Sequence, residues 1–244
     1  QIGEWQNAEK EITESINLLK SLNGNSQDEL KLLASALEIQ GKLQLSVGKP
    51  KQALIAWQDA ANKFEQADIQ EGEIRSKINQ SLALQELGRY REAYKILAGL
   101  VGDLPQQSEL IQATAYRVIG NAIREAGLVD DEEEKIKLLS LLPDNLLKLN
   151  YLQVSRKFLQ HSLKIYQILG SNQPNNAQLK QDIAETYFSL GNTERAAYYR
   201  AKDASQRIGL EIRKYDKNTQ LKLLLASIKY YEDSEKITTV PSTK

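Results

Sequence analysis

Glycine recurs at a nearly constant interval along the chain, and this repeat constrains the fold more than any other sequence feature. Gly3, Gly48, Gly88 and Gly127 each end a segment of apolar periodicity, at intervals of 45, 40 and 39 residues. A sequence period in this range is typical of stacked supersecondary units that bury their apolar faces against one another. Glycine at the end of such a segment also suits the left-handed conformation that often ends a helix.

Small and bulky residues hold fixed positions around these glycines. Small side chains let two helix backbones approach closely, whereas a bulky side chain fills the space between neighbouring helix pairs. The apolar residues in between have helical spacing, and β-branched alternation is nowhere sustained, so we expect an all-α fold. The small residues are Gly41, Ser81 and Gly120 on one helix and Ala8, Ala53 and Ala93 on the next, and the bulky ones are Ile12, Trp57 and Leu97.

The second half of the chain repeats this pattern with a longer interval. Ser155 and Ala226 take the place of Ala93, and each lies 35 residues after its preceding small residue, Gly120 or Gly191, where the regular repeat has 12. Two equal excesses predict lengthened helices or an inserted helix rather than irregular loops. The bulky residues that follow these two positions are Leu159 and Tyr230.

The segment from Asn79 to Ala93 resembles the end of one tetratricopeptide (TPR) helix, its turn and the start of the next helix. The resemblance implies a TPR-like right-handed α-solenoid of antiparallel helix pairs. We expect a single solenoid over residues 1–244, with regular repeats in 1–127, longer helices or inserts in 128–236 and a linker in 237–244. Because the first residue is Gln and no Met is present, we expect this sequence to be a segment of a longer chain.

Four runs resemble, in the same order, the repeat region of cyanobacterial CHAT-domain proteins: residues 48–60, 76–85, 189–196 and 228–232. In that family a TPR solenoid precedes a caspase-like protease domain with a His–Cys pair. This sequence contains no Cys, so the resemblance implies a recognition or regulatory array that serves a protease domain outside it. The acidic insert at 130–149 departs from the family pattern, and its role stays open.

The composition excludes several classes of site. Without Cys the chain holds no disulfide, no Cys-ligated zinc and no cysteine nucleophile, and a metal site would require carboxylates and the only histidine, His161. The 32 basic and 32 acidic residues balance, which gives no general attraction to nucleic acid or anionic membrane. No stretch approaches the ~20 apolar residues of a membrane span. We therefore expect no metal, cofactor, nucleic-acid partner or membrane span, and the cytoplasm is only slightly favoured as the compartment.

No motif in the sequence indicates catalysis. His161 lies in a helical run without a nucleophile elbow elsewhere in the chain, so we interpret it as an ordinary helical histidine. The acidic run Asp130–Glu134 lacks the alternation of a calcium loop and is expected to cap the helix Glu132–Leu142, although a partner-binding acidic patch is the alternative. We predict that the segment is not an enzyme.

The resemblance to TPR arrays implies that the first helix of each pair lines a concave groove. Asn side chains there could hold a peptide backbone, and Arg could pair with carboxylates of an acidic or C-terminal peptide. The alternative is that these residues only keep the solenoid soluble. Glu38, Glu86 and Glu185 interrupt the set. The predicted groove residues are Lys42, Arg75, Asn79, Arg117, Asn121, Arg124, Asn192 and Arg195, and a separate basic helix face holds Arg200, Arg207 and Lys214.

Together these features predict a non-catalytic protein–protein interaction module. The family resemblance implies that it is the recognition or regulatory TPR region of a CHAT-type protease system. Its expected partner is a protein or peptide, and the predicted basic groove favours an acidic one. Two alternatives stay open: a structural or assembly factor that docks on a large complex, and a segment of an enzyme whose active domain lies elsewhere in the parent chain. The sequence indicates neither the partner nor the oligomeric state.

Overall fold

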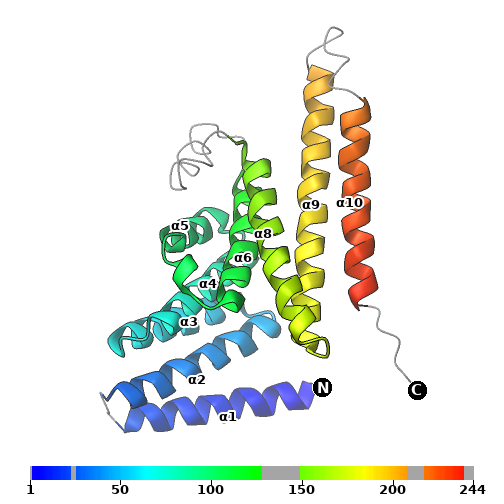
Figure 1. The fold of residues 1–244 in the computed structure, drawn as a ribbon. Helices are drawn as coiled ribbons and strands as arrows, with labels where there is room; N and C mark the ends of the chain where they lie inside the picture. Colours follow the sequence, from blue (N-terminus) through cyan, green and yellow to red (C-terminus); the bar gives the residue numbers. More distant parts are fainter. Residues whose placement is uncertain (1, 23–25, 128–148, 208–216, 239–244) are drawn as a thin grey trace, which may run out of the picture. The chain divides into compact units, whose positions relative to one another are not determined.

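The computed structural model describes residues 2–22, 26–127, 149–207 and 217–238, and over these residues the fold is all-α (Figure 1). They form nine α-helices and one short 3₁₀-helix, with no β-strand among the described residues. The all-α prediction is therefore confirmed. No helix in these ranges is both long enough and apolar enough to span a bilayer.

The chain forms two compact units, and the first comprises Gln1–Gln107. Within it each α-helix packs against the next one, so that sequence neighbours are also neighbours in space. The helices bury Trp57, Phe64 and Tyr94 as their largest side chains. The elements are α1 (Ile2–Ser21), α2 (Gln27–Ser46), α3 (Pro50–Gln66), α4 (Gln70–Glu86), α5 (Tyr90–Leu100) and the 3₁₀-helix η1 (Leu104–Gln106).

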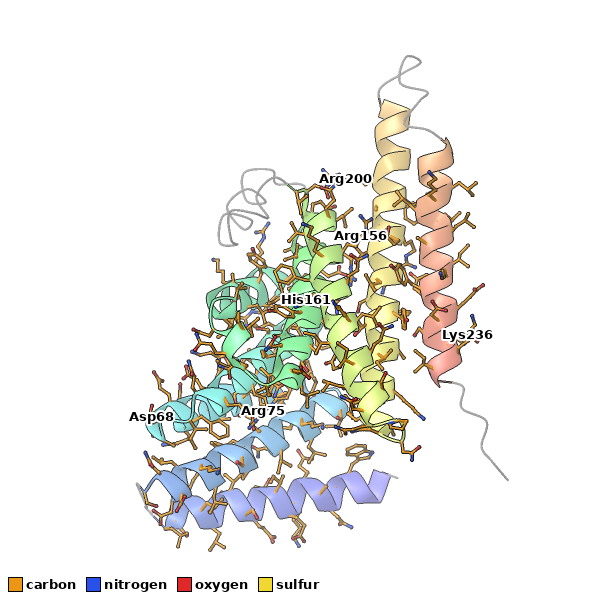
Figure 2. All side chains as sticks on the ribbon, viewed as in Figure 1. Asp68, Arg75, Arg156, His161, Arg200 and Lys236 are labelled. Carbon is orange, nitrogen blue, oxygen red and sulfur yellow. The ribbon has the colours of Figure 1, made fainter. Side chains whose placement is uncertain are left out.

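One type of turn joins three successive helix pairs of this unit. Gly48 and Gly88 have φ values of 73° and 71°, which confirms the left-handed conformation expected there. Asp68 takes the same role between α3 and α4 with a φ of 55°, 20 residues from each glycine (Figure 2). In every case the next N–H donates to a carbonyl of the ending helix: Lys49 to Gln44, Ile69 to Phe64 and Arg89 to Leu84, at 2.8, 2.9 and 2.8 Å.

The other two glycines of the predicted series behave differently. Gly127 ends the helix before it, but its φ of −76° is right-handed. Gly3 lies in the first turn of α1 and ends no helix there. The glycine spacing therefore marks the helix ends correctly at three of the four positions.

Several glycines lie where a neighbouring helix presents a large side chain. A Cβ on Gly41 would lie 2.6 Å from Trp57, and one on Gly120 would lie 2.7 Å from Leu159. The small residues thus lie at close helix contacts, but the bulky residues fill the space within a helix pair, whereas the sequence pattern predicted them between neighbouring pairs. At the last pair Gly191 meets Tyr231, one residue beyond the predicted Tyr230.

The second unit is Ser108–Lys244, and its described residues form four α-helices. α8 packs against both α6 and α9, and α9 lies side by side with α10 (Figure 1). With 31 residues α9 is the longest described helix. The predicted helix Glu132–Leu142 and its acidic run lie outside the described residues. The helices are α6 (Glu109–Ala126), α8 (Tyr151–Asn172), α9 (Ala177–Arg207) and α10 (Lys217–Thr238).

Candidate functional site

The predicted groove residues of the first unit are not equivalent in the structure. Lys42 is exposed on α2, and Asn79 is half-buried on α4. Arg75 of α4 pairs with Glu38 of α2, with Nε donating to Oε1 at 3.0 Å and Nη2 to Oε2 at 2.7 Å. Ser76 donates a further hydrogen bond to the same carboxylate. Glu38, which the sequence presents as an interruption of the basic set, is thus the partner of Arg75.

The Arg75–Glu38 pair is partly shielded from water. The guanidinium lies 5.7 Å from the centre of the Phe64 ring, and hydrogen bonding to Glu38 raises the pKa of Arg75 above its ordinary value (Figure 2). Because two of its donors are already engaged, this arginine links two helices of the first unit. Its half-exposed side chain has less capacity for a ligand than its residue type suggests.

In the second unit Arg117 reaches from α6 to α9. Its Nη1 donates to Oε2 of Glu185 at 2.6 Å and its Nη2 to Oδ1 of Asp182 at 3.4 Å, and only 12% of the side chain is exposed. Burial acts to lower the pKa of Arg117, but Tyr166 and the two carboxylates outweigh it and raise the pKa. The Nε atom is buried without a hydrogen-bond partner among the described residues.

Arg124 makes a second bridge from α6, about two helical turns after Arg117. Its Nη1 donates to Oδ1 of Asn121 at 3.1 Å and to the carbonyl oxygen of Ser189 at 3.0 Å. Its other donors bind Glu125, and the residue is buried. The structure therefore brings Arg117, Asn121 and Arg124 together on one side of α6, where the two arginines contact α9.

The remaining predicted residues are spread along α9. Asn192 accepts a hydrogen bond from the Tyr231 hydroxyl at 3.0 Å, and Arg195 is exposed. Arg200 lies 4.9 Å from the centre of the Tyr151 ring, a cation–π contact between α9 and α8 (Figure 2). The side chains of Arg207 and Lys214 lie outside the described part of the chain, so the predicted basic face is described only at Arg200.

The structure also contains an ion pair that the sequence reasoning missed. Arg156 of α8 binds Glu194 of α9 through Nη2 and Oε2 at 2.7 Å and through a second bond from Nε to Oε1 (Figure 2). Glu194 is only 3% exposed. The two residues are 38 apart in sequence, almost the 37 that separate Glu38 from Arg75. A similar interval between an acidic and a basic residue in both units was the sequence signal that could have indicated this ion pair.

His161 packs as a helical residue. It is exposed on α8, with its ring edge-on to Tyr116 of α6 at a centroid distance of 4.8 Å (Figure 2). Among the described residues no group of three or more His, Asp or Glu side chains is arranged to hold a metal ion.

A pocket of about 680 Å³ lies in the second unit beside the Arg117 bridge. One face of α9 from Ala177 to Ser189 forms most of its lining, Arg117 comes from α6, and Ser234 and Ile237 come from α10. Phe188 in this lining is 54% exposed, although its ring also contacts Tyr231 at a centroid distance of 5.5 Å. Pockets of this size accommodate small ligands or side chains of a bound peptide.

Comparison with known proteins adds little to this geometry. No protein-family model and no curated protein sequence matches the chain. Among solved structures, the crystal structure of BtubC (BKLC) from P. vanneervenii aligns with a TM-score of 0.46 and 12% sequence identity, over 96% of this chain and 88% of that chain. This likeness is too distant to assign a fold family or a function.

Proposed function

We propose that the chain is a non-catalytic protein–protein interaction module, built as a TPR-like right-handed solenoid of antiparallel helix pairs. The observation that carries the proposal is the repetition of one structural unit. Helices joined by the same left-handed turn follow one another at 20-residue intervals in the first unit. Small residues lie at helix contacts in both units. Stacked helices of this kind expose long continuous surfaces, and repeat proteins use such surfaces to bind partners.

The second unit offers a surface suited to such a role. Its pocket combines an exposed aromatic ring, Phe188, with hydrogen-bonding groups from three helices. Aromatic and arginine side chains with polar groups around them are typical of protein-binding surfaces. The buried bridges of Arg117 and Arg124 fix α6 against α9 and so stabilise the walls of this pocket.

We further propose that the partner is a CHAT-type protease system, for which the chain supplies the recognition or regulatory array. The support is the resemblance of four sequence runs to that family. In this proposal the protease chemistry lies outside these residues, because they contain no Cys.

A structural or assembly role is the second candidate, and one observation favours it. Leu221, Leu225 and Ile228 of α10 are all exposed and recur at spacings of four and three residues, which places them on one helix face. An exposed apolar stripe of this kind can dock on another protein. In this role the chain binds through the exposed apolar face of α10.

Cross-linking separates the two roles. The tagged chain is expressed in the cells it comes from, treated with a lysine-reactive cross-linker and analysed by mass spectrometry. A recognition module is expected to give partner cross-links at Lys180 in the pocket, whereas a docking factor is expected to give them at Lys222 and Lys229 of α10. Peptide hydrolysis by the purified chain alone would contradict a non-catalytic role.

A partner identified in this way also tests the protease assignment. The purified partner is assayed for peptidase activity with and without the chain. A change in cleavage rate or in the substrates cleaved supports the CHAT-type role. A partner without a His–Cys protease domain, whose properties the chain leaves unchanged, would contradict it.

A further inference from the structure

The pocket of the second unit has two chemically different ends. Lys180, Ala184 and Phe188 line it at spacings of four residues, and therefore lie along one face of α9. At the helical rise, Lys180 and Phe188 are separated by about 12 Å along the helix axis. A ligand of two or three peptide residues can therefore contact a charged group at one end and an aromatic ring at the other.

Lys180 is the group at the charged end that stays available. The acids beside it are already engaged: Oε2 of Glu185 accepts from Arg117 at 2.6 Å, its Oε1 accepts from Gln181 at 3.0 Å, and Asp182 also binds Arg117. By contrast, the ammonium group of Lys180 makes no ion pair or hydrogen bond within the described ranges 149–207 and 217–238, nor with α6. The charged group without an ion pair at this end is therefore a cation.

The start of α9 adds to this positive character. The helix begins at Ala177, which also lines the pocket, so the positive end of the helix dipole lies at the same end as Lys180. Asn176 caps the helix by accepting a hydrogen bond from the Leu179 N–H at 3.1 Å. An anionic group in the pocket would meet both the dipole and the ammonium group.

The other end of the pocket is apolar and partly open. One part of the Phe188 ring contacts Tyr231, but more than half of the side chain remains exposed. Ala184 and Ile237 supply further apolar surface. Ser234 of α10 donates to the Ala184 carbonyl at 2.9 Å, which holds α10 against α9 at this level. An apolar side chain of a ligand could bury the exposed part of the ring.

We propose that this pocket binds a peptide segment of a partner protein in which an acidic side chain lies next to an aromatic or aliphatic one. The carboxylate pairs with Lys180, and the apolar side chain packs on Phe188 and Ile237. This inference rests on the proposed function, because it names the kind of segment that the interaction module recognises.

The test measures fluorescence anisotropy of labelled octapeptides bound to the full chain. The peptides are acetylated and amidated, share Gly and Ser flanks, and differ only at two central positions, which hold Glu-Phe, Lys-Phe or Glu-Ser. The Glu-Phe peptide is expected to bind at least tenfold more tightly than the other two, because loss of a charge-assisted bond or of a buried ring costs about tenfold in affinity. Unlabelled 3-phenylpropionate is added as a competitor to distinguish a peptide from a small free acid.

Two substitutions assign the binding to the pocket. Lys180→Glu is expected to reverse the preference, so that Lys-Phe binds more tightly than Glu-Phe, and Phe188→Ala is expected to weaken Glu-Phe about tenfold. Matched controls on α10 are Lys229→Glu and Leu225→Ala, which change an exposed lysine and an equally exposed apolar residue outside the pocket. Both controls are expected to keep the affinity of the parent chain. Melting curves confirm that each variant is folded.

Three outcomes would overturn the inference: equal affinity for all three peptides, unchanged peptide preference in Lys180→Glu, or competition by 3-phenylpropionate as strong as that of the peptide. The last outcome would make the pocket a small-molecule site. If a partner protein binds the chain and its affinity is the same in Lys180→Glu, the proposed function stands and only the pocket assignment fails. If Glu-Phe peptides bind but no cellular protein does, the proposed function fails instead.

Discussion

Replacing Gly41 by Ala tests whether the small residues of the repeat are required by close helix contact. The added Cβ would lie 2.6 Å from Nε1, 2.7 Å from Cε2 and 2.8 Å from Cδ1 of Trp57. Ordinary contact begins at 3.4 Å, so the indole must move by roughly 1 Å. Trp57 is 2% exposed and packs in the core of the first unit, which leaves little space for such a shift.

The free-energy change follows from three terms. Overpacking of a well-packed core costs about 2 kcal/mol. The shift also breaks the bond from Nε1 of Trp57 to the Glu38 carbonyl, which is already 3.2 Å long and contributes about 1 kcal/mol. The greater helix propensity of Ala returns about 1 kcal/mol. We expect Gly41→Ala to lower the free energy of unfolding by about 2 kcal/mol.

The assay is urea denaturation, followed by far-UV circular dichroism and by tryptophan emission. The chain has two Trp residues, so a Trp5→Phe background leaves the buried Trp57 as the only source of tryptophan emission. Gly99→Ala is the matched control: this exposed glycine lies in α5, where a Cβ would have no neighbour within 4 Å. The control is expected to raise the free energy of unfolding by about 0.5 kcal/mol.

The result that would refute the reasoning is a Gly41→Ala chain at least as stable as the Gly99→Ala chain. A second comparison isolates the contact itself. In a Trp57→Phe background the smaller ring has no Nε1, so the added cost of Gly41→Ala is expected to fall below about 1 kcal/mol. An undiminished cost there would show that Trp57 is not the cause.

Three further substitutions test the ion pairs, burial and capping. Arg117→Ala removes a largely buried guanidinium that binds Asp182 and Glu185 and should lower the free energy of unfolding by about 3 kcal/mol, whereas exposed Arg195→Ala should change it by less than about 0.5 kcal/mol in the same urea assay. Burial raises the pKa of Tyr94 above 10.0, so its stabilisation is complete below that pH and is lost as the pH rises; the fall in unfolding free energy between about pH 9 and about pH 11 should be smaller in Tyr94→Phe. Asn150→Ala removes the side-chain cap of α8 and should lower the midpoint of thermal unfolding by an amount equivalent to about 1 kcal/mol, and an unchanged midpoint would contradict this.

The sequence predicts the helix ends where glycine is the residue that the backbone needs. Gly48 and Gly88 adopt φ values that strongly favour glycine, so their spacing is informative. Asp68 makes the same turn between α3 and α4 without glycine. Asp tolerates the left-handed region but is common elsewhere, so its type alone does not mark the turn. A 20-residue interval from both glycines would have marked it.

The sequence located the small residues at helix contacts better than it located the bulky residue that contacts Gly191. Gly41 and Gly120 meet Trp57 and Leu159 of the paired helix, whereas the sequence pattern predicted such bulky residues between neighbouring pairs. At the last pair the contact is Gly191 with Tyr231. Two adjacent tyrosines follow Ala226 there, and they point about 100° apart on the helix, so an error of one residue in the register exchanges one for the other.

The sequence indicates on which helix face a polar residue lies, but it does not indicate which residue binds it. Helical periodicity shows which face of α6 holds Arg117, yet it does not show which acid of α9 lies opposite. That acid is Glu185, which the sequence presented as an interruption of a basic groove. The same applies to Arg75 and Glu38 in the first unit. A side chain that looks free for a ligand in the sequence is engaged once the next helix supplies its counter-charge.

The pairing of Arg117 with two acids affects which ligand charge the pocket of the second unit prefers. The charges of Arg117, Lys180, Asp182 and Glu185 sum to zero, so the net charge of this group predicts no preference between acidic and basic ligands. The preference follows instead from which groups keep free hydrogen-bonding capacity. Arg117 engages both acids, and Lys180 is left with unengaged donors at the start of α9. Arg117 is therefore better described as a positioning residue that occupies the carboxylates. Its removal would make the local charge more negative and would shift the preference at the same place towards a basic ligand.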